Sequence, residues 1–138
     1  MRVLHHLYGH VIIPLAVADE LGAAQAPLVV RNWILNPPDW LQIQSVENSE
    51  IVNPSKLDPG EQEAILLAEQ INADLIILDD KATRTIAAQL QLKTIGLLGI
   101  LKDAANEGLL DLEAAFDQLR DAGFWVSPGL LDRLLQDL

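Results

Sequence analysis

The sequence predicts an α/β domain with a largely parallel sheet, and three observations support this class. Stretches with helical spacing of apolar residues alternate with short apolar runs typical of buried strands. Half of the 138 residues are hydrophobic and only 4% are aromatic, so a mainly aliphatic core is available for one domain over residues 1–138. The clearest strand, residues 75–78, ends in Asp79 and Asp80. The carboxyl ends of parallel strands are where open sheets form ligand-binding crevices.

The first half of the chain predicts short elements separated by proline and glycine. Gly9 and Gly22 end two helices, and Pro14 suits the first turn of the second helix. Pro27 precedes another stretch, and Asn-Pro-Pro-Asp at residues 36–39 forms a break. The expected elements are a short apolar helix (3–8), a buried strand (11–13), a helix ending at residue 21, a helical or mixed stretch (28–35), an alternating edge strand (41–46) and a polar loop (47–56).

The second half opens with the strongest helix signal in the sequence. Asp58 occupies the N-cap position, Pro59 the N1 position and Glu61 the N3 position, which is the arrangement of a capping box. Apolar residues at helical spacing continue to Ile71. The further expected elements are a strand (75–78), a helix (81–90), a strand (93–95), a helix (96–107) closed by Gly108, and a C-terminal helical tail (about 111–138) made of helices at 111–121 and 128–138.

Charge and cysteine content narrow the functional classes. The formal net charge is −11, so broad electrostatic binding to nucleic acid is unfavourable, and any such contact would be local and assisted by a metal ion or a basic partner. The chain has no cysteine, which excludes disulfides and thiolate metal sites and fits a reducing cytosol. No apolar stretch reaches the ~18 residues of a membrane span, and the N-terminus lacks a secretory apolar region. We therefore expect a soluble cytoplasmic protein without membrane contact.

Acids at the end of the predicted strand and at a helix start are candidate ligands for a divalent metal. Two or three carboxylates that converge at one sheet edge would suit Mg²⁺, which prefers oxygen ligands. Asp80 can equally cap the helix that begins at Lys81. Glu61 can fold back onto the amide of its cap residue, and on sequence alone this structural interpretation outweighs the functional one. Side chains alternate along a strand, so Asp79 and Asp80 share one space only where the chain is already turning.

Other polar and aromatic residues have weaker functional signals. Lys81 and Arg84 lie three apart on one helix face, where they can position a substrate phosphate or balance the local charge. The three histidines lack the spacing of a helical ligand pair, and the three tryptophans lack a repeated basic context. We therefore do not expect His5, His6 and His10 to be metal ligands. For Trp33, Trp40 and Trp125 we expect core or interface packing.

Residues 57–110 combine a PGE motif, a helix, an apolar strand ending in Asp-Asp and an IGLLGIL segment. They read LDPGEQEAILLAEQINADLIILDDKATRTIAAQLQLKTIGLLGILKDAANEGLL. In order and spacing this block resembles the DUF3368-type subfamily of PIN domains, in the VapC-like nuclease superfamily of bacteria and archaea. Ahead of it, LYGHVIIPLAVADEL resembles the segment that follows the first strand and helix of that subfamily. The resemblance covers most of residues 4–110.

This resemblance implies a PIN-like, doubly wound parallel sheet with flanking helices. It also implies a Mg²⁺- or Mn²⁺-dependent ribonuclease, with RNA as substrate and, in a toxin–antitoxin pair, a small antitoxin-like protein as partner. Glu61 and Asp79, followed by Asp80, are the catalytic and metal-binding acids that it implies. A metal there would lower the pKa of a bound water and stabilise charge at the phosphate.

Two departures from the subfamily pattern bear on catalysis. The subfamily opens with a central strand that ends in an acid, often DTSPL, whereas this sequence begins Met1-Arg2-Val3-Leu4, within the expected first helix. The hydroxyl residue of the subfamily's G-T-L-G segment is replaced by Leu97.

A missing central strand would leave backbone groups unpaired beside a hydrophobic face, at a cost of several kcal/mol. Either the gene start is misplaced, or another segment or subunit fills the gap. We favour an N-terminally shortened protein that compensates by altered packing or homo-oligomerisation. An alternative to the nuclease is therefore a catalytically inactive PIN-like binding or assembly module.

Overall fold

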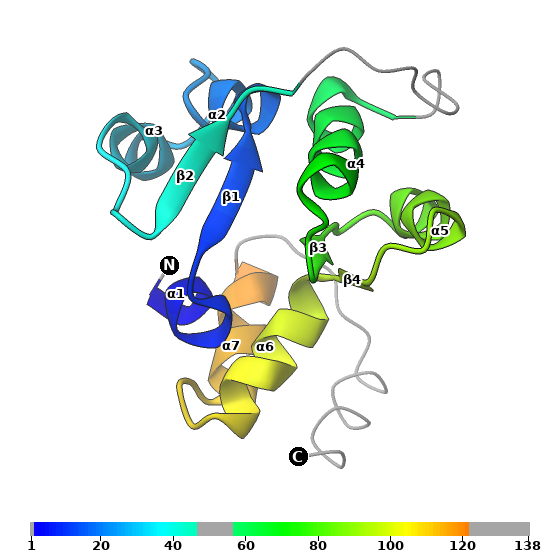
Figure 1. Cartoon of the computed structure of the whole chain (residues 1–138). Coiled ribbons are helices and arrows are strands. Elements are labelled where there is room, and N and C mark those ends of the chain that lie inside the picture. Colours follow the sequence, from blue (N-terminus) through cyan, green and yellow to red (C-terminus); the bar gives the residue numbers. More distant parts are fainter. Residues whose placement is uncertain (1, 47–56, 122–138) are drawn as a thin grey trace. The chain divides into compact units, whose positions relative to one another are not determined.

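The computed structural model describes residues 2–46 and 57–121 (Figure 1). The chain divides into two compact units, one over Arg2–Ile95 and one that begins at Gly96. The expected loop at 47–56 and the expected final helix at 128–138 lie outside the described residues. None of the described helices is long and apolar enough to cross a membrane.

The N-terminal part of the first unit alternates short helices and strands. Its elements are α1 (Arg2–Tyr8), β1 (Val11–Pro14), α2 (Leu15–Leu21), α3 (Leu28–Leu35) and β2 (Leu41–Gln44). β1 and β2 pair in parallel, with Val11 opposite Leu41. Gly9 makes the turn into β1 with φ of 71°, a conformation that favours glycine. Pro14 and Pro27 are the N-cap residues of α2 and α3, and neither provides a side-chain cap.

A small aromatic and aliphatic core holds this part together. Ala18, Ile34 and Leu41 are buried, and two tryptophans pack against them. The rings of Trp33 and Trp40 lie with their centroids 6.1 Å apart. The expected packing role of these two tryptophans is thus confirmed, whereas Trp125 lies outside the described residues. Two histidines also make local contacts: the ring of His5 stacks on Trp40, and His10 hydrogen-bonds Gln42 at 3.1 Å.

The second part of this unit follows the sequence signals closely. Its elements are α4 (Pro59–Ile71), β3 (Ile76–Ile77), α5 (Lys81–Gln89) and β4 (Thr94–Ile95), with β3 and β4 paired in parallel. The capping box predicted at Asp58 and Glu61 is present. Asn72 ends α4 in the left-handed conformation, with φ of 52°. A continuous core joins the two helices to β3 and consists of Leu57, Ile65, Ala68, Ile76, Leu78, Ile86 and Ala87.

The four described strands form two separate pairs, β1–β2 and β3–β4, rather than one continuous sheet. In a parallel sheet, the backbone N–H and C=O of one residue bond to the strand on one side, and those of the next residue point toward the other side. The amides of Ile76 and Leu78 bond to β4, so the backbone of Ile77 faces the other edge. Likewise Val11 bonds to Trp40 beside β2, so Ile12 faces away from β2. Among the described residues, β1 and β3 therefore each have one open edge, and α4 contacts both strands.

The second unit contains two described helices, α6 (Leu97–Asn106) and α7 (Leu112–Asp121). Leu112 and Phe116 are fully buried between them. Gly108 forms the connecting turn with φ of 73°. Both helices begin and end within one residue of the predicted positions. Across the described residues, helices alternate with parallel strands, which confirms the α/β class.

Candidate active site

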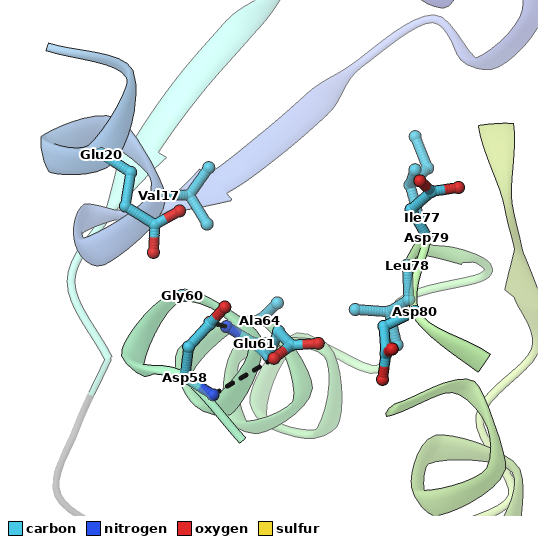
Figure 2. A pocket seen from close by; sticks show the side chains of 10 residues that line it. All are labelled: Val17, Glu20, Asp58, Gly60, Glu61, Ala64, Ile77, Leu78, Asp79 and Asp80. Carbon is cyan, nitrogen blue, oxygen red and sulfur yellow. Dashed lines mark hydrogen bonds between the residues drawn. The ribbon is translucent and has the colours of Figure 1, made fainter. Parts of the chain in front are cut away.

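A pocket of about 480 Å³ in the first unit gathers acids from three segments of the chain (Figure 2). α2 contributes one wall, the first turns of α4 another, and the carboxyl end of β3 the third. The acids that line it are Glu20, Asp58, Glu61, Asp79 and Asp80. The three residues predicted as metal ligands, Glu61, Asp79 and Asp80, are therefore brought to the same pocket.

The start of α4 fixes Glu61 at the pocket through its capping box. The Glu61 amide donates to Asp58 Oδ1 at 2.8 Å, and the Asp58 amide donates to Glu61 Oε1 at 3.1 Å. The capping interpretation of Glu61 is thus confirmed. The cap uses one carboxylate oxygen, and the other, Oε2, is turned toward α5, where it accepts from the Thr83 hydroxyl. Capping and a place in the site are compatible because they engage different oxygens.

The end of β3 presents two adjacent acids in different directions. Asp80 is the N-cap of α5, and its Oδ2 accepts from the Thr83 amide at 2.9 Å. These hydrogen bonds from Thr83, first backbone and then side chain, hold the pKa of Asp80 below its usual value. Figure 2 shows the Asp79 and Asp80 carboxylates, which follow β3, pointing away from each other.

Thr83 is a site residue that the sequence analysis missed. It is fully buried, and its hydroxyl contacts both Asp80 Oδ2, at 2.8 Å, and Glu61 Oε2. A hydroxyl has one proton, so it donates to one of these carboxylates at a time. Thr83 therefore joins the acid of α4 to the acid that follows β3. A hydroxyl residue three positions after an N-cap Asp is the sequence signal that could have indicated it.

Glu20 is a second missed residue, and it lies against the first turn of α4. Its carboxylate accepts a hydrogen bond from the Gly60 amide. Burial raises the pKa of Glu20, with further increases from the nearby carboxylates of Asp58 and Glu61. A Cβ atom on Gly60 would lie 2.5 Å from Glu20 Oε1, so a side chain at position 60 would displace the Glu20 carboxylate from this place. Sequence spacing gave no sign of this contact because it joins segments far apart in the chain.

Arg84 and Lys81, the two basic residues predicted near a substrate phosphate, differ in their contacts. Arg84 Nη1 donates to the main-chain carbonyls of Asp79 and Leu78, at 2.8 and 3.2 Å. The guanidinium thus fastens α5 to the end of β3. Lys81 is exposed at the first position of α5.

Comparison with known families agrees with this arrangement of parallel strands and acids. The family model DUF3368, described as a PIN domain, matches residues 1–138. The chain belongs to the PIN-domain family. Searches of curated proteins and of solved structures found no match. The predicted family and the α/β fold of this PIN domain are thus confirmed.

PIN domains are in general dependent on divalent metals, so we asked whether the pocket acids fit such an ion. Among residues 2–46 and 57–121, no three His, Asp or Glu side chains are placed to hold one ion together. Mg²⁺, however, is usually bound through one or two carboxylates, with water and substrate phosphates completing its shell. Glu61 Oε2 and Asp80 Oδ2 both contact the Thr83 hydroxyl. The pocket acids offer oxygen donors, the kind of ligand that a hydrated Mg²⁺ or Mn²⁺ takes.

Proposed function

We propose that this PIN domain is a divalent-metal-dependent ribonuclease that hydrolyses phosphodiester bonds at its acidic pocket. The observation that carries the proposal is the convergence of five carboxylates from α2, α4 and the end of β3 on one pocket. The raised pKa of Glu20 reports mutual repulsion among these acids in addition to burial. A bound cation would relieve that repulsion.

In this proposal, Glu61, Asp79 and Asp80 are the catalytic acids, which would hold Mg²⁺ or Mn²⁺. The ion would supply a water of lowered pKa and charge stabilisation at the phosphate. Glu20, whose pKa is raised by burial and neighbouring acids, is the carboxylate best suited to take up the proton released by the attacking water.

RNA is the proposed substrate, and its contacts would be confined to the surroundings of the pocket. The chain has a net charge of −11, which opposes extended binding to a phosphate backbone. Lys81 is the basic candidate for a substrate phosphate, and Arg84 would act indirectly because its guanidinium holds the strand end. The same acidic character supports a small basic protein, such as an antitoxin, as the partner.

A calorimetric Mn²⁺ titration combined with an RNA cleavage assay tests the nuclease proposal. Asp79→Asn removes a pocket charge at a position that caps no helix, and Asp74→Asn is the matched control at an exposed acid outside the pocket. We expect Mn²⁺ binding and metal-dependent cleavage in the unmodified chain and in Asp74→Asn. In Asp79→Asn we expect cleavage to fall by at least ~100-fold. Full cleavage by Asp79→Asn would contradict the assignment.

A second candidate function, a binding or assembly module without catalysis, is favoured by the open strand edges. The backbones of Ile12 and Ile77 face away from their paired strands, and no partner for either edge lies among the described residues. Exposed strand edges are sites where another extended chain can add by main-chain hydrogen bonds. Absence of Mn²⁺ binding by the unmodified chain would favour this module over the nuclease.

A further inference from the structure

The first turn of α2 is completed by a side chain from α4. α2 begins after Pro14, which provides no side-chain cap, so the amides of its first turn need acceptors from elsewhere. The Ala16 amide, the second of the helix, donates to Glu63 Oε1 at 3.1 Å in a partly buried contact. A capping side chain normally accepts from an amide at this position, and a carboxylate there is favoured by the helix dipole. Glu63 thus does for α2 what Pro14 cannot do.

A second hydrogen bond joins the same two helices in the opposite sense. Glu20, near the end of α2, accepts from the Gly60 amide in the first turn of α4. Glu20 lies four residues after Ala16, so both are on one face of α2. Glu63 lies three residues after Gly60, so both are on one face of α4. Each helix therefore provides a carboxylate to the first turn of the other, and the two links are about one helical turn apart.

We propose that Glu63 is a positioning residue, which holds the start of α2 against α4 and thereby fixes where the Glu20 carboxylate lies. Glu63 is not one of the described residues that line the pocket, so it acts on the pocket through α2. Glu20 is exposed, so few neighbours confine its side chain and its place depends on the helix that carries it. α2 has only seven residues, so a displacement of its first turn reaches Glu20 one turn later.

The hydrogen bond, rather than the charge of Glu63, is the basis of this role. Burial raises the pKa of Glu20, as do the charges of Asp58 and Glu61, whereas Glu63 is not one of the charges that shift it. Glu63→Gln removes the charge but keeps an oxygen that accepts from the Ala16 amide, and Glu63→Ala removes both. The two variants therefore separate an effect of charge from an effect of position.

Amide hydrogen exchange of the full, metal-free chain, followed by NMR, tests the positioning role without any need for activity. In Glu63→Ala we expect the Ala16 and Gly60 amides to exchange at least ~5-fold faster than in the unmodified chain. The Ala68 amide, in the buried part of α4, should exchange as before because the change is local. Glu63→Gln should keep the Gly60 rate within ~2-fold of the original. Glu69→Ala removes an exposed acid from the same helix and is the matched control, which should exchange like the unmodified chain.

Cleavage kinetics of the same variants with Mn²⁺ test the consequence for the reaction. This part rests on the proposed function, in which Glu20 takes up the proton of the attacking water. We expect Glu63→Ala to lower kcat by about 10-fold and to leave the KM for RNA within about 2-fold, because Glu63 does not line the pocket. Glu63→Gln should restore kcat.

Four results would overturn the inference. They are a Gly60 exchange rate that is unchanged in Glu63→Ala, equal acceleration in Glu63→Gln, acceleration of Ala68 to the same extent, and a kcat that is unaffected although Gly60 exchanges faster. Absence of cleavage by the unmodified chain would instead refute the proposed nuclease, and the exchange rates would still decide whether Glu63 positions Glu20. Alanine is the best helix former and Glu63 is only partly buried, so Glu63→Ala should retain the circular dichroism spectrum of the unmodified chain.

Discussion

The two parts of the first unit, residues 2–46 and 57–95, begin their helices in different ways. α4 and α5 each start at an aspartate whose side chain accepts from a backbone amide of the first turn. α2 and α3 each start after a proline that provides no side-chain cap. Caps satisfy orphan amides and add about 1 kcal/mol each, so helix starts in the second part are specified locally.

This difference extends to burial and to the site. Residues 57–95 enclose a core of seven buried apolar residues, and their caps deliver Asp58, Glu61 and Asp80 to the pocket. Residues 2–46 bury three residues in their own cluster and leave the outer face of α3 exposed. The comparison teaches that three of the five pocket acids, Asp58, Glu61 and Asp80, also take part in starting their own helices, whereas Glu20 and Asp79 reach the pocket without that role.

Truncation of a core residue in the capped part should have the largest effect on stability. Ile65 is 4% exposed within the core between α4 and β3. We expect Ile65→Ala to lower the free energy of unfolding by about 3 kcal/mol, through lost burial and the cavity it leaves. Val29→Ala, on the exposed face of α3, should change it by less than about 0.5 kcal/mol. Urea denaturation measures the free energy of unfolding of both variants. Equal losses of stability in Ile65→Ala and Val29→Ala would contradict the contrast in burial.

Removal of the hydroxyl that joins the pocket acids should have an intermediate effect. Thr83→Val keeps the shape of this buried side chain but removes its donor to Asp80 and Glu61, at a cost of about 2 kcal/mol. Thr83→Ser keeps the donor and loses one methyl group, about 1 kcal/mol. A Ser variant less stable than the Val variant would show that packing, rather than the hydroxyl, is the contribution of Thr83. Thermal and urea unfolding of the metal-free protein distinguish these outcomes.

The smallest expected effects are changes in folding stability with pH, which have opposite directions for Asp80 and Glu20. The pKa of Asp80 is lowered by the Thr83 bonds, so its stabilising contribution is present at neutral pH. That contribution is lost as pH falls from the ordinary value of 3.8 through the lower native value. The advantage of the unmodified chain over Asp80→Asn should therefore shrink as the pH falls below 3.8.

Glu20 has a raised pKa, so its contribution is present below the ordinary value of 4.5 and is lost as pH rises through the higher native value. Glu20→Gln should accordingly be slightly more stable than the unmodified chain at pH 7, and the gain should be small because the group is largely solvated. Denaturation midpoints across the pH range check both trends. A Gln variant that is less stable at pH 7 would show that the Gly60 hydrogen bond outweighs burial and repulsion.

Much of the fold could be predicted because its signals are local. The cap at Asp58, the breaks at glycine and proline, and the apolar spacing of α6 and α7 depend only on nearby residues, and the predicted elements are present. Three of the four strands were predicted longer than they are, whereas β1 extends one residue beyond its prediction, to Pro14. Residues 75–78 reduce to Ile76–Ile77, because regular pairing ends where the chain turns into α5.

The site was predicted only where it coincides with helix caps or a strand end. Glu61, Asp79 and Asp80 were found, and the structure places all three at the pocket. Glu20 was missed because its role arises from a contact across the fold, which no spacing rule in a single sequence encodes. Thr83 has a local signal, its spacing from the N-cap Asp80, but its contact with Glu61 likewise crosses the fold. Whether these acids hold a metal stays a prediction.

Gly60 has a consequence for how this pocket can vary. The space left by its missing side chain is where the Glu20 carboxylate lies against the helix start and accepts from the Gly60 amide. A side chain at position 60 would push that exposed, flexible carboxylate aside, so the glycine preserves the position of one acid rather than the fold of the helix.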